Sequence, residues 1–281
     1  MTEAVMEAGP KARRGAGRGQ GASVGETRRF YMWMSGACLA IAVLGFMPTY
    51  FVPIAKGAFK AEPMVHIHGI VLFSWVVFFF TQSWLVAQGK VLAHRTWGML
   101  GISLITAMTF IVTALVSLRV RQAGLPGQPA GLAHDVRAFS WVTMSGLAFI
   151  VPAFTLAIVK LKDSETHKRL ILLLTISMLG APIARWFLTF LAPPPDPNAP
   201  PLPAGLPVVN VPPVAVAVTP ALIGDLLWIV AMVYDWRTRG RVHPVYLIGG
   251  GIMLALQVTL VPVANSELWQ SIAAAIGRLA G

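Results

Sequence analysis

The sequence contains a single cysteine, Cys38, in a chain of 281 residues. One cysteine allows neither an intrachain disulfide nor a cysteine-based metal cluster. Charged residues are also scarce, because Asp, Glu, Lys and Arg make up 12% of the chain, against about 25% in a typical soluble domain. The signatures GxGxxG, HExxH, GxSxG and GxxxxGK followed by Ser or Thr are absent. The sequence therefore lacks these four enzyme signatures, and whether the protein is an enzyme stays open.

Long apolar runs take the place of the missing charges. Hydrophobic residues account for 56% of the chain and collect in separate stretches. Each stretch approaches or exceeds the ~20 residues that a helix needs to cross a bilayer, and a backbone surrounded by lipid must form its hydrogen bonds within its own helix. We therefore predict an all-α, polytopic membrane helix bundle of about seven transmembrane helices in a lipid bilayer. The runs cover residues 30–53, 64–88, 96–118, 138–160, 168–191, 214–234 and 244–264.

The basic residues indicate membrane orientation rather than a nucleic-acid partner. The chain carries a net charge of +11, but its Lys and Arg residues lie mainly at the ends of the apolar runs. Lys and Arg in short loops mark the cytoplasmic side of a membrane protein. Their distribution predicts that the N-terminus lies in the cytoplasm and that the protein binds no nucleic acid.

The composition divides the chain into three parts. Residues 1–27 contain too few large apolar side chains to fold, so we predict a disordered basic cytoplasmic tail. Residues 28–265 form the predicted transmembrane bundle, and residues 266–281 form a short C-terminal segment. Within the bundle, residues 192–213 are rich in proline, which cannot continue the flanking helices, and we predict an extracytoplasmic loop there. This loop is either a semi-rigid lid over the outer face or an extended linker.

All six histidines lie near the ends of the predicted helices, and the topology sorts them into two groups. A neutral imidazole is a good ligand for iron, copper and zinc, so each group is a candidate site for b-type haem or a transition metal. The alternative is that these side chains hydrogen-bond lipid headgroups or loop carbonyls. The outer group is His66, His68 and His134, and the inner group is His94, His167 and His243.

Two heptad repeats select further polar residues. His68, Trp75 and Gln82 share one stripe of the second run, because members of a heptad drift by only ~20° on a helix. His66 points away from that stripe, so we expect His68 to face the bundle. Such stripes either pack helices together, with Gly allowing close approach and Gln bonding across helices, or line a ligand channel. The second stripe consists of His243, Gly250 and Gln257.

Two ionisable residues, Arg185 and Asp225, lie deep within the apolar runs rather than near their ends. A charged side chain inside a bilayer costs about 2.5 to 3.5 kcal/mol even on a lenient scale. We therefore predict that both side chains face the interior of the bundle and pair with each other. Such a pair either fixes the register of two helices or belongs to a proton or ligand site.

Several short motifs together resemble a known group of proteins. They are HIHG at 66–69 with Gln82 downstream, HRTWG at 94–98, HKRLILLLT at 167–175 and GRVHP at 240–244. As a set they resemble a family of uncharacterised bacterial multipass inner-membrane proteins, of the domain-of-unknown-function type with HxHG, HRxxG and HKRL motifs. The resemblance implies a helix bundle in the bacterial inner membrane and carries over no reaction.

Three functions remain open from the sequence. The first is a redox or metal-associated membrane protein that holds haem b or a transition metal through His68 and His134, or through His94, His167 and His243. The second is a small-molecule or proton-coupled carrier with a polar path formed by Asp225, Arg185, Gln82 and Gln257. The third is a non-catalytic membrane scaffold or assembly factor.

Overall fold

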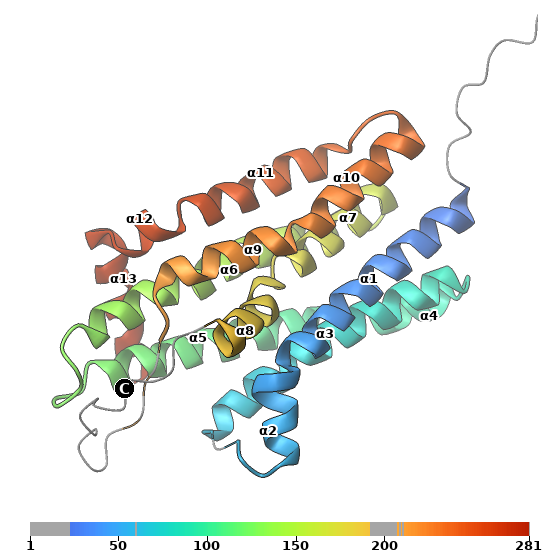
Figure 1. Ribbon diagram of the computed structural model, residues 1–281. Helices are drawn as coiled ribbons and strands as arrows, with labels where there is room; N and C mark the ends of the chain where they lie inside the picture. Colours follow the sequence, from blue (N-terminus) through green and yellow to red (C-terminus); the bar gives the residue numbers. More distant parts are fainter. Residues whose placement is uncertain (1–22, 60, 192–206, 208, 210, 281) are drawn as a thin grey trace, which may run out of the picture.

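The structure of the protein is a computed structural model that describes residues 23–59, 61–191, 207, 209 and 211–280. These residues form helices and their connections and contain no strand. Figure 1 shows the long helices lying side by side in one bundle. The prediction of an all-α, polytopic bundle of about seven helices is confirmed.

Six helical stretches of the described chain are long and apolar enough to cross a bilayer. A seventh, Pro244–Val258, is apolar but shorter, and the next helix extends it to Ala264. Large apolar side chains on these helices are exposed, among them Phe110 at 73% and Ile70 at 62%. A soluble protein seldom exposes so much apolar surface, so lipid is the medium around the bundle. The six spans are Val24–Ala55, Pro63–Ala87, Val91–Ala123, Leu132–Val159, Ser164–Phe190 and Val214–Arg239.

The first span begins with a capping box. Ser23 Oγ accepts a hydrogen bond from the Glu26 backbone N–H (3.2 Å), and the Ser23 N–H donates to Glu26 Oε2 (2.6 Å). This reciprocal pair satisfies free N–H groups at a helix start, so α1 (Val24–Phe46) begins ahead of the boundary expected at residue 28. Residues 1–22 of the predicted tail lie outside the described residues. A wider π-helical segment (Met47–Phe51) leads from α1 into α2 (Val52–Ala55).

The next spans fold back and forth beside α1. The helix α3 packs along α1 and α5, and α5 packs in turn against α6. A single residue, Met99, separates α4 from α5. The bounds are α3 (Pro63–Ala87), α4 (Val91–Gly98), α5 (Leu100–Ala123) and α6 (Leu132–Val159).

The remaining spans are each divided into shorter helices. The fifth consists of α7 (Ser164–Ile176) and α8 (Gly180–Phe190). The sixth consists of a 3-10 turn (Val214–Ala217), α9 (Val218–Gly224) and α10 (Leu226–Arg239), and the seventh of α11 (Pro244–Val258) and α12 (Leu260–Ala264).

The α7 helix forms the centre of the core. Leu172, Leu173 and Leu174 are fully buried, because α7 contacts α1, α6, α10 and α11. The last span approaches its neighbour closely at Gly250, where an added Cβ would overlap the Trp228 ring. Gly250, the middle member of the second predicted stripe, therefore makes a packing contact.

The C-terminal segment belongs to the bundle. The helix α13 (Glu267–Gly277) packs against α5 and α6, and the Trp269 indole N–H donates to the Arg137 carbonyl (2.8 Å). The segment is therefore more than a short appendage after the last span. The predicted Pro-rich loop lies largely outside the described residues, which omit 192–206, 208 and 210.

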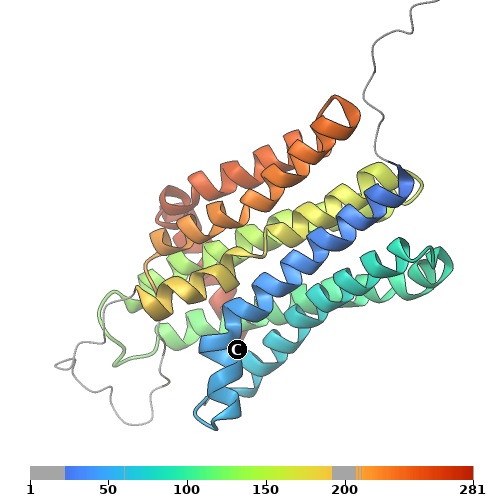
Figure 2. The same cartoon turned by 45° about the vertical axis from the view of Figure 1, so that its right-hand side comes forward.

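The bundle has two ends, which Figures 1 and 2 show at opposite sides of the molecule. We call the end at which α1 begins the amino-terminal end, and the other the distal end. The amino-terminal end also holds the connections 88–90, 160–163 and 240–243, and the distal end holds the connections 56–62, 124–131 and 265–266.

Candidate functional site

Three breaks in the helices cluster within the bundle. Residues Ser177–Leu179 separate α7 from α8, Asp225 separates α9 from α10, and Thr259 separates α11 from α12. At the first break the N–H groups of Met178 and Leu179 bond to carbonyls three residues earlier, at 3.1 and 2.9 Å. At the other two positions the helical hydrogen bonds continue, because the Asp225 N–H bonds to the Ala221 carbonyl and the Thr259 N–H bonds to the Ala255 carbonyl, each at 3.1 Å. The tight turn between α7 and α8 lies beside a cavity.

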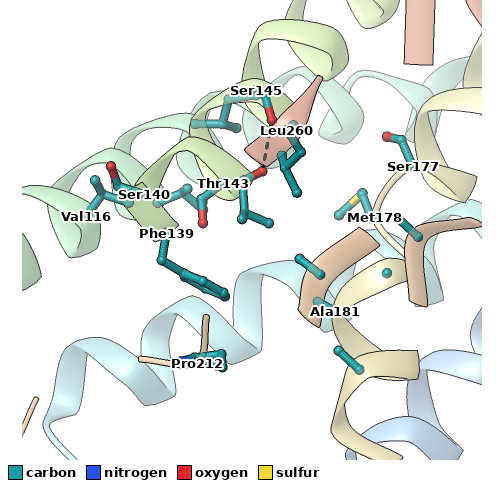
Figure 3. A pocket seen from close by; sticks show the side chains of 18 of the residues that line it. Val116, Phe139, Ser140, Thr143, Ser145, Ser177, Met178, Ala181, Pro212 and Leu260 are labelled. Atoms are coloured by element: carbon teal, nitrogen blue, oxygen red, sulfur yellow. Dashed lines mark hydrogen bonds between the residues drawn. The ribbon is translucent and has the colours of Figure 1, made fainter. Parts of the chain in front are cut away.

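The cavity lies between the spans, in the distal part of the bundle, and has a volume of about 540 Å³. Most of its lining is apolar, and its side chains come from all but the first of the spans. Figure 3 shows Ser140, Thr143 and Ser145 of α6 on one side of the cavity and Ser177 and Met178 on the other. The polar residues that line it are His68, Arg119, Ser140, Thr143, Ser145, Ser177, Arg185 and Gln257.

The serine hydroxyls are engaged with their own helices. Ser140 Oγ donates to the Arg137 carbonyl (2.6 Å), and Ser177 Oγ donates to the Leu174 carbonyl (2.7 Å). Ser145 Oγ donates to the Val142 carbonyl (3.2 Å). Because their hydrogens are already used, these hydroxyls present mainly acceptor lone pairs to the cavity.

His68 and His66 face different surroundings, as the heptad pattern predicts. His68 lines the cavity, and its Nδ1 is buried without a hydrogen-bond partner in the part of the chain that the structure describes. His66 instead shares a hydrogen bond between its Nδ1 and the Tyr50 hydroxyl (3.1 Å). A buried polar atom without a partner costs about 1–3 kcal/mol, so the His68 nitrogen is available to a ligand.

Arg185 also lines the cavity, but it does not form the predicted pair with Asp225. Its guanidinium lies over the Phe46 ring, 5.4 Å from the ring centre. Among the described residues no carboxylate lies within ion-pair distance of Arg185. The cavity therefore contains a cation that no described residue neutralises.

Asp225 takes Gln257 as its partner instead. Gln257 Nε2 donates to Asp225 Oδ1 (3.3 Å), and this bond joins the break in the sixth span to the last span. Asp225 Oδ2 and Gln257 Oε1 are buried without a partner among the described residues. Gln257 lines the cavity, whereas Asp225 does not line it and is connected to it by the hydrogen bond to Gln257. The predicted Asp225–Arg185 pair is therefore not formed, and the hydrogen-bond partner of Asp225 is Gln257.

Arg119 is partly neutralised at the distal end. Its Nη2 lies 3.9 Å from Glu62 Oε2, and its Nη1 donates to Gln122 Oε1 (3.2 Å). Gln122 Nε2 in turn donates to Glu62 Oε1 (3.1 Å). This network ties α5 to the start of α3 and leaves Arg185 as the main positive group of the cavity.

The predicted polar path and histidine groups are only partly assembled. Gln82 does not line the cavity; it lies near Gly98, where an added Cβ would be 4.0 Å from its Oε1. His134 is exposed beside Asp135 (3.3 Å). No three His, Cys, Asp or Glu side chains in the described ranges are placed to hold a metal ion. The three-histidine inner set is therefore divided, and only His94 and His167 lie together, with ring centres 6.4 Å apart.

His243, the third inner histidine, caps α11. Its ring Nδ1 accepts a hydrogen bond from the Val245 backbone N–H (3.3 Å), and the backbone N–H of His243 donates to Asp235 Oδ2 (3.3 Å). Burial lowers the pKa of His243 below its usual value, and the nearby charge of Arg169 adds to this effect. The geometry therefore favours a neutral ring that caps the N-terminus of α11.

Sequence reasoning missed a buried charge cluster at the amino-terminal end. Arg169 and Asp235 are both fully buried, and Arg169 Nη1 also donates to Glu165 Oε2 (2.7 Å). Arg239 contacts the same Glu165 carboxylate. The signal in the sequence was the HKRL motif, in which Arg169 lies at the start of the predicted run 168–191, but Asp235 lay one residue outside the predicted run 214–234. The cluster joins α7 to α10 and leaves no free charge in its interior.

Comparisons with protein-family models, curated proteins and solved structures find no match for this chain. The function is therefore inferred from the chemistry and the positions of the residues.

Proposed function

We propose that this integral membrane protein is a carrier-type protein that binds a small amphipathic anion in the distal cavity. The observation that carries the proposal is Arg185, a cation that lines a cavity of about 540 Å³ without a carboxylate partner among the described residues. An uncompensated charge in a membrane protein marks a ligand or ion pathway more often than a packing element.

The size and lining of the cavity suit such a ligand. Small-molecule sites commonly enclose about 300–1,000 Å³ and combine an apolar lining with a few placed polar groups. The apolar lining would cover a hydrocarbon tail, and Arg185 would bind a carboxylate or phosphate head through charge-assisted hydrogen bonds. The unpartnered Nδ1 of His68 offers a second polar contact in the same cavity.

The break in the fifth span supports movement of the ligand as well as binding. Carriers often place their substrate sites where transmembrane helices are discontinuous, and here Ser177 and Met178, between α7 and α8, line the cavity. Asp225, at the second break, has one unpartnered carboxylate oxygen and reaches the cavity through Gln257. We infer that Asp225 exchanges a proton when the anion binds or leaves.

The location and orientation are part of the proposal. The concentration of Lys and Arg in the N-terminal segment and in the connections of the amino-terminal end supports an N-terminus in the cytoplasm. The bacterial inner membrane is the location that the resemblance of the HxHG, HRxxG and HKRL motifs implies. In that orientation the cavity lies in the extracytoplasmic half of the bundle. Reporter fusions test this orientation, because a periplasm-dependent reporter would be active after residue 281 and inactive before residue 23.

A scaffold function requires neither the cavity nor its unpartnered groups. Of the predicted histidine sets, the structure brings together only His94 and His167, and these lie at the opposite end of the bundle. The distal cavity therefore favours the carrier hypothesis over both.

Binding of decanoate by the purified protein in a non-ionic detergent tests the proposal. Decanol and decyltrimethylammonium, which have the same chain length but are neutral or cationic, are the matched probes. We expect saturable binding of decanoate only, weakened about 10- to 100-fold in Arg185→Gln, as the loss of a charged hydrogen bond of about 1.5–3 kcal/mol implies. Arg241→Gln, at an exposed position at the amino-terminal end, is the control and should bind normally.

Asp225→Asn tests proton coupling separately. The amide conserves the size of the side chain and can still bond to Gln257. We expect a folded protein that binds decanoate but, in liposomes, no longer takes up protons together with it. Equal binding of the three probes, or unchanged decanoate binding by Arg185→Gln, would overturn the proposed function.

A further inference from the structure

We propose that His94 and His167 form a two-imidazole site for a late first-row transition metal at the amino-terminal end of the bundle. This site is separate from the distal cavity, whose lining contains neither histidine. His94 lies on α4 and His167 on α7, so residues 73 positions apart in the chain bring the two rings together across the fold.

The separation of the rings fits one metal ion between them. Their centres are 6.4 Å apart and their planes are inclined by 78°. Two metal–nitrogen bonds of about 2.0–2.1 Å, with roughly 1.1 Å from each nitrogen to its ring centre, span about 6.3 Å when the nitrogens lie on opposite sides of the metal. A direct edge-to-face contact of two rings also occurs at such distances, so the state of the ring nitrogens decides between the two.

The hydrogen bond of His167 sets which ring nitrogen carries the hydrogen in its neutral form. Its Nδ1 lies 2.9 Å from the carbonyl oxygen of Ala157, a fully buried residue of α6. A carbonyl only accepts hydrogen bonds, so Nδ1 carries the hydrogen and the Nε2 lone pair of the neutral ring is free. Histidines that bind metals commonly donate their other ring N–H to a backbone carbonyl in this way.

His94 supplies the second unpartnered nitrogen. Its Nδ1 is buried and has no hydrogen-bond partner in the described part of the chain. Both rings are half-buried, so a bound ion would be shielded by protein and still reachable from the amino-terminal end. A metal–nitrogen bond would give this buried nitrogen a partner and offset the free-energy cost of its desolvation.

The ligand set indicates which metals fit. Imidazole nitrogens suit zinc, copper, nickel and iron, whereas magnesium and calcium prefer oxygen ligands. The described residues place no third His, Cys, Asp or Glu beside the pair, so a bound metal keeps open positions for water or another ligand. The shared chemistry is a metal held by two imidazoles, and the metal is either a free ion or the iron of a haem.

The test uses the full chain in a non-ionic detergent, after treatment with a chelator. We expect one equivalent of Zn²⁺ or Cu²⁺ to bind in a calorimetric titration, with affinity at least 10-fold lower in His94→Gln and in His167→Gln. His134→Gln, an exposed histidine beside Asp135, is the matched control and should bind like the unmodified protein. Addition of haemin is the second arm, in which a Soret band and sharp reduced α and β bands that need both histidines identify haem as the source.

A measurement on the unmodified chain keeps the proposal testable if either variant fails to fold. Diethyl pyrocarbonate modifies free imidazole nitrogens, and mass spectrometry locates the modified residues. We expect the metal to protect His94 and His167 together while His134 remains reactive. Stoichiometric binding that both variants retain, absence of binding, or reactivity of the pair that metal leaves unchanged would each overturn the proposal. Arg185→Gln should bind metal normally, so failure of one proposal is distinguishable from failure of the other.

Discussion

Arg169 and Asp235 form a doubly hydrogen-bonded ion pair that is completely buried between α7 and α10. Arg169 Nε donates to Asp235 Oδ2 at 2.8 Å, and Nη2 donates to Oδ1. Arg169 Nη1 donates to the Glu165 carbonyl at 2.8 Å, so the guanidinium is held on three sides. The Tyr246 ring lies 5.7 Å from the guanidinium carbon. The pair therefore connects three spans through one buried cation.

Asp235→Asn should destabilise the folded protein by about 3–5 kcal/mol, because it removes the fully buried counter-charge of Arg169 and leaves only the part-exposed Glu165 carboxylate beside it. Replacing both residues, in Arg169→Met with Asp235→Leu, should recover most of that loss, since an apolar pair carries no desolvation cost. Thermal unfolding in detergent, followed by tryptophan fluorescence, measures both effects. Arg239→Gln, whose side chain is 35% exposed, should have a much smaller effect. An equal loss in the single and double variants would contradict a role for unpaired charge.

Gly250→Ala should destabilise the protein by about 1–3 kcal/mol, because the added methyl group overlaps the Trp228 ring and forces the packed helices apart. Gly251→Ala is the matched control on the same helix, since a Cβ there meets nothing within 4 Å. Its effect should be neutral or slightly stabilising, because alanine favours the helix more than glycine does. The midpoints of thermal unfolding compare the two variants, and similar destabilisation of both would exclude the Trp228 contact as the cause.

Acidification should weaken the start of α11 through His243. The pKa of His243 is lowered in the folded protein, chiefly by burial, so the unfolded chain takes up the proton first as the pH falls. The stabilisation by the neutral ring is complete above the unfolded value of 6.5 and is lost as the pH falls through the lower, folded pKa.

The unfolding temperature measured from pH 7.5 to pH 5 checks this dependence. His243→Asn keeps a helix-capping acceptor that does not titrate, so this variant should lose less stability across the same interval. An identical pH profile for the variant and the unmodified protein would assign the dependence to other groups.

Local patterns predicted those features that depend on a single helix. The heptad of His68, Trp75 and Gln82 separated His68 from His66, since both lie on one regular helix whose geometry is known in advance. Trp75 and Gln82 are buried, as the stripe requires. In contrast, the predicted pairing of Arg185 with Asp225 failed, because a pair between two helices depends on their rotation and offset.

Sequence by itself determined that this chain crosses a membrane as a bundle of helices, because a backbone in hydrocarbon has few alternatives and about 20 apolar residues span it. Only the tertiary structure decided which polar groups meet. The crossing of the spans placed Arg185 and His68 on one cavity, joined Asp225 to Gln257, buried Arg169 against Asp235 and brought His94 to His167. Those contacts arise from side-chain packing between distant segments, which the spacing of residues along one helix does not specify.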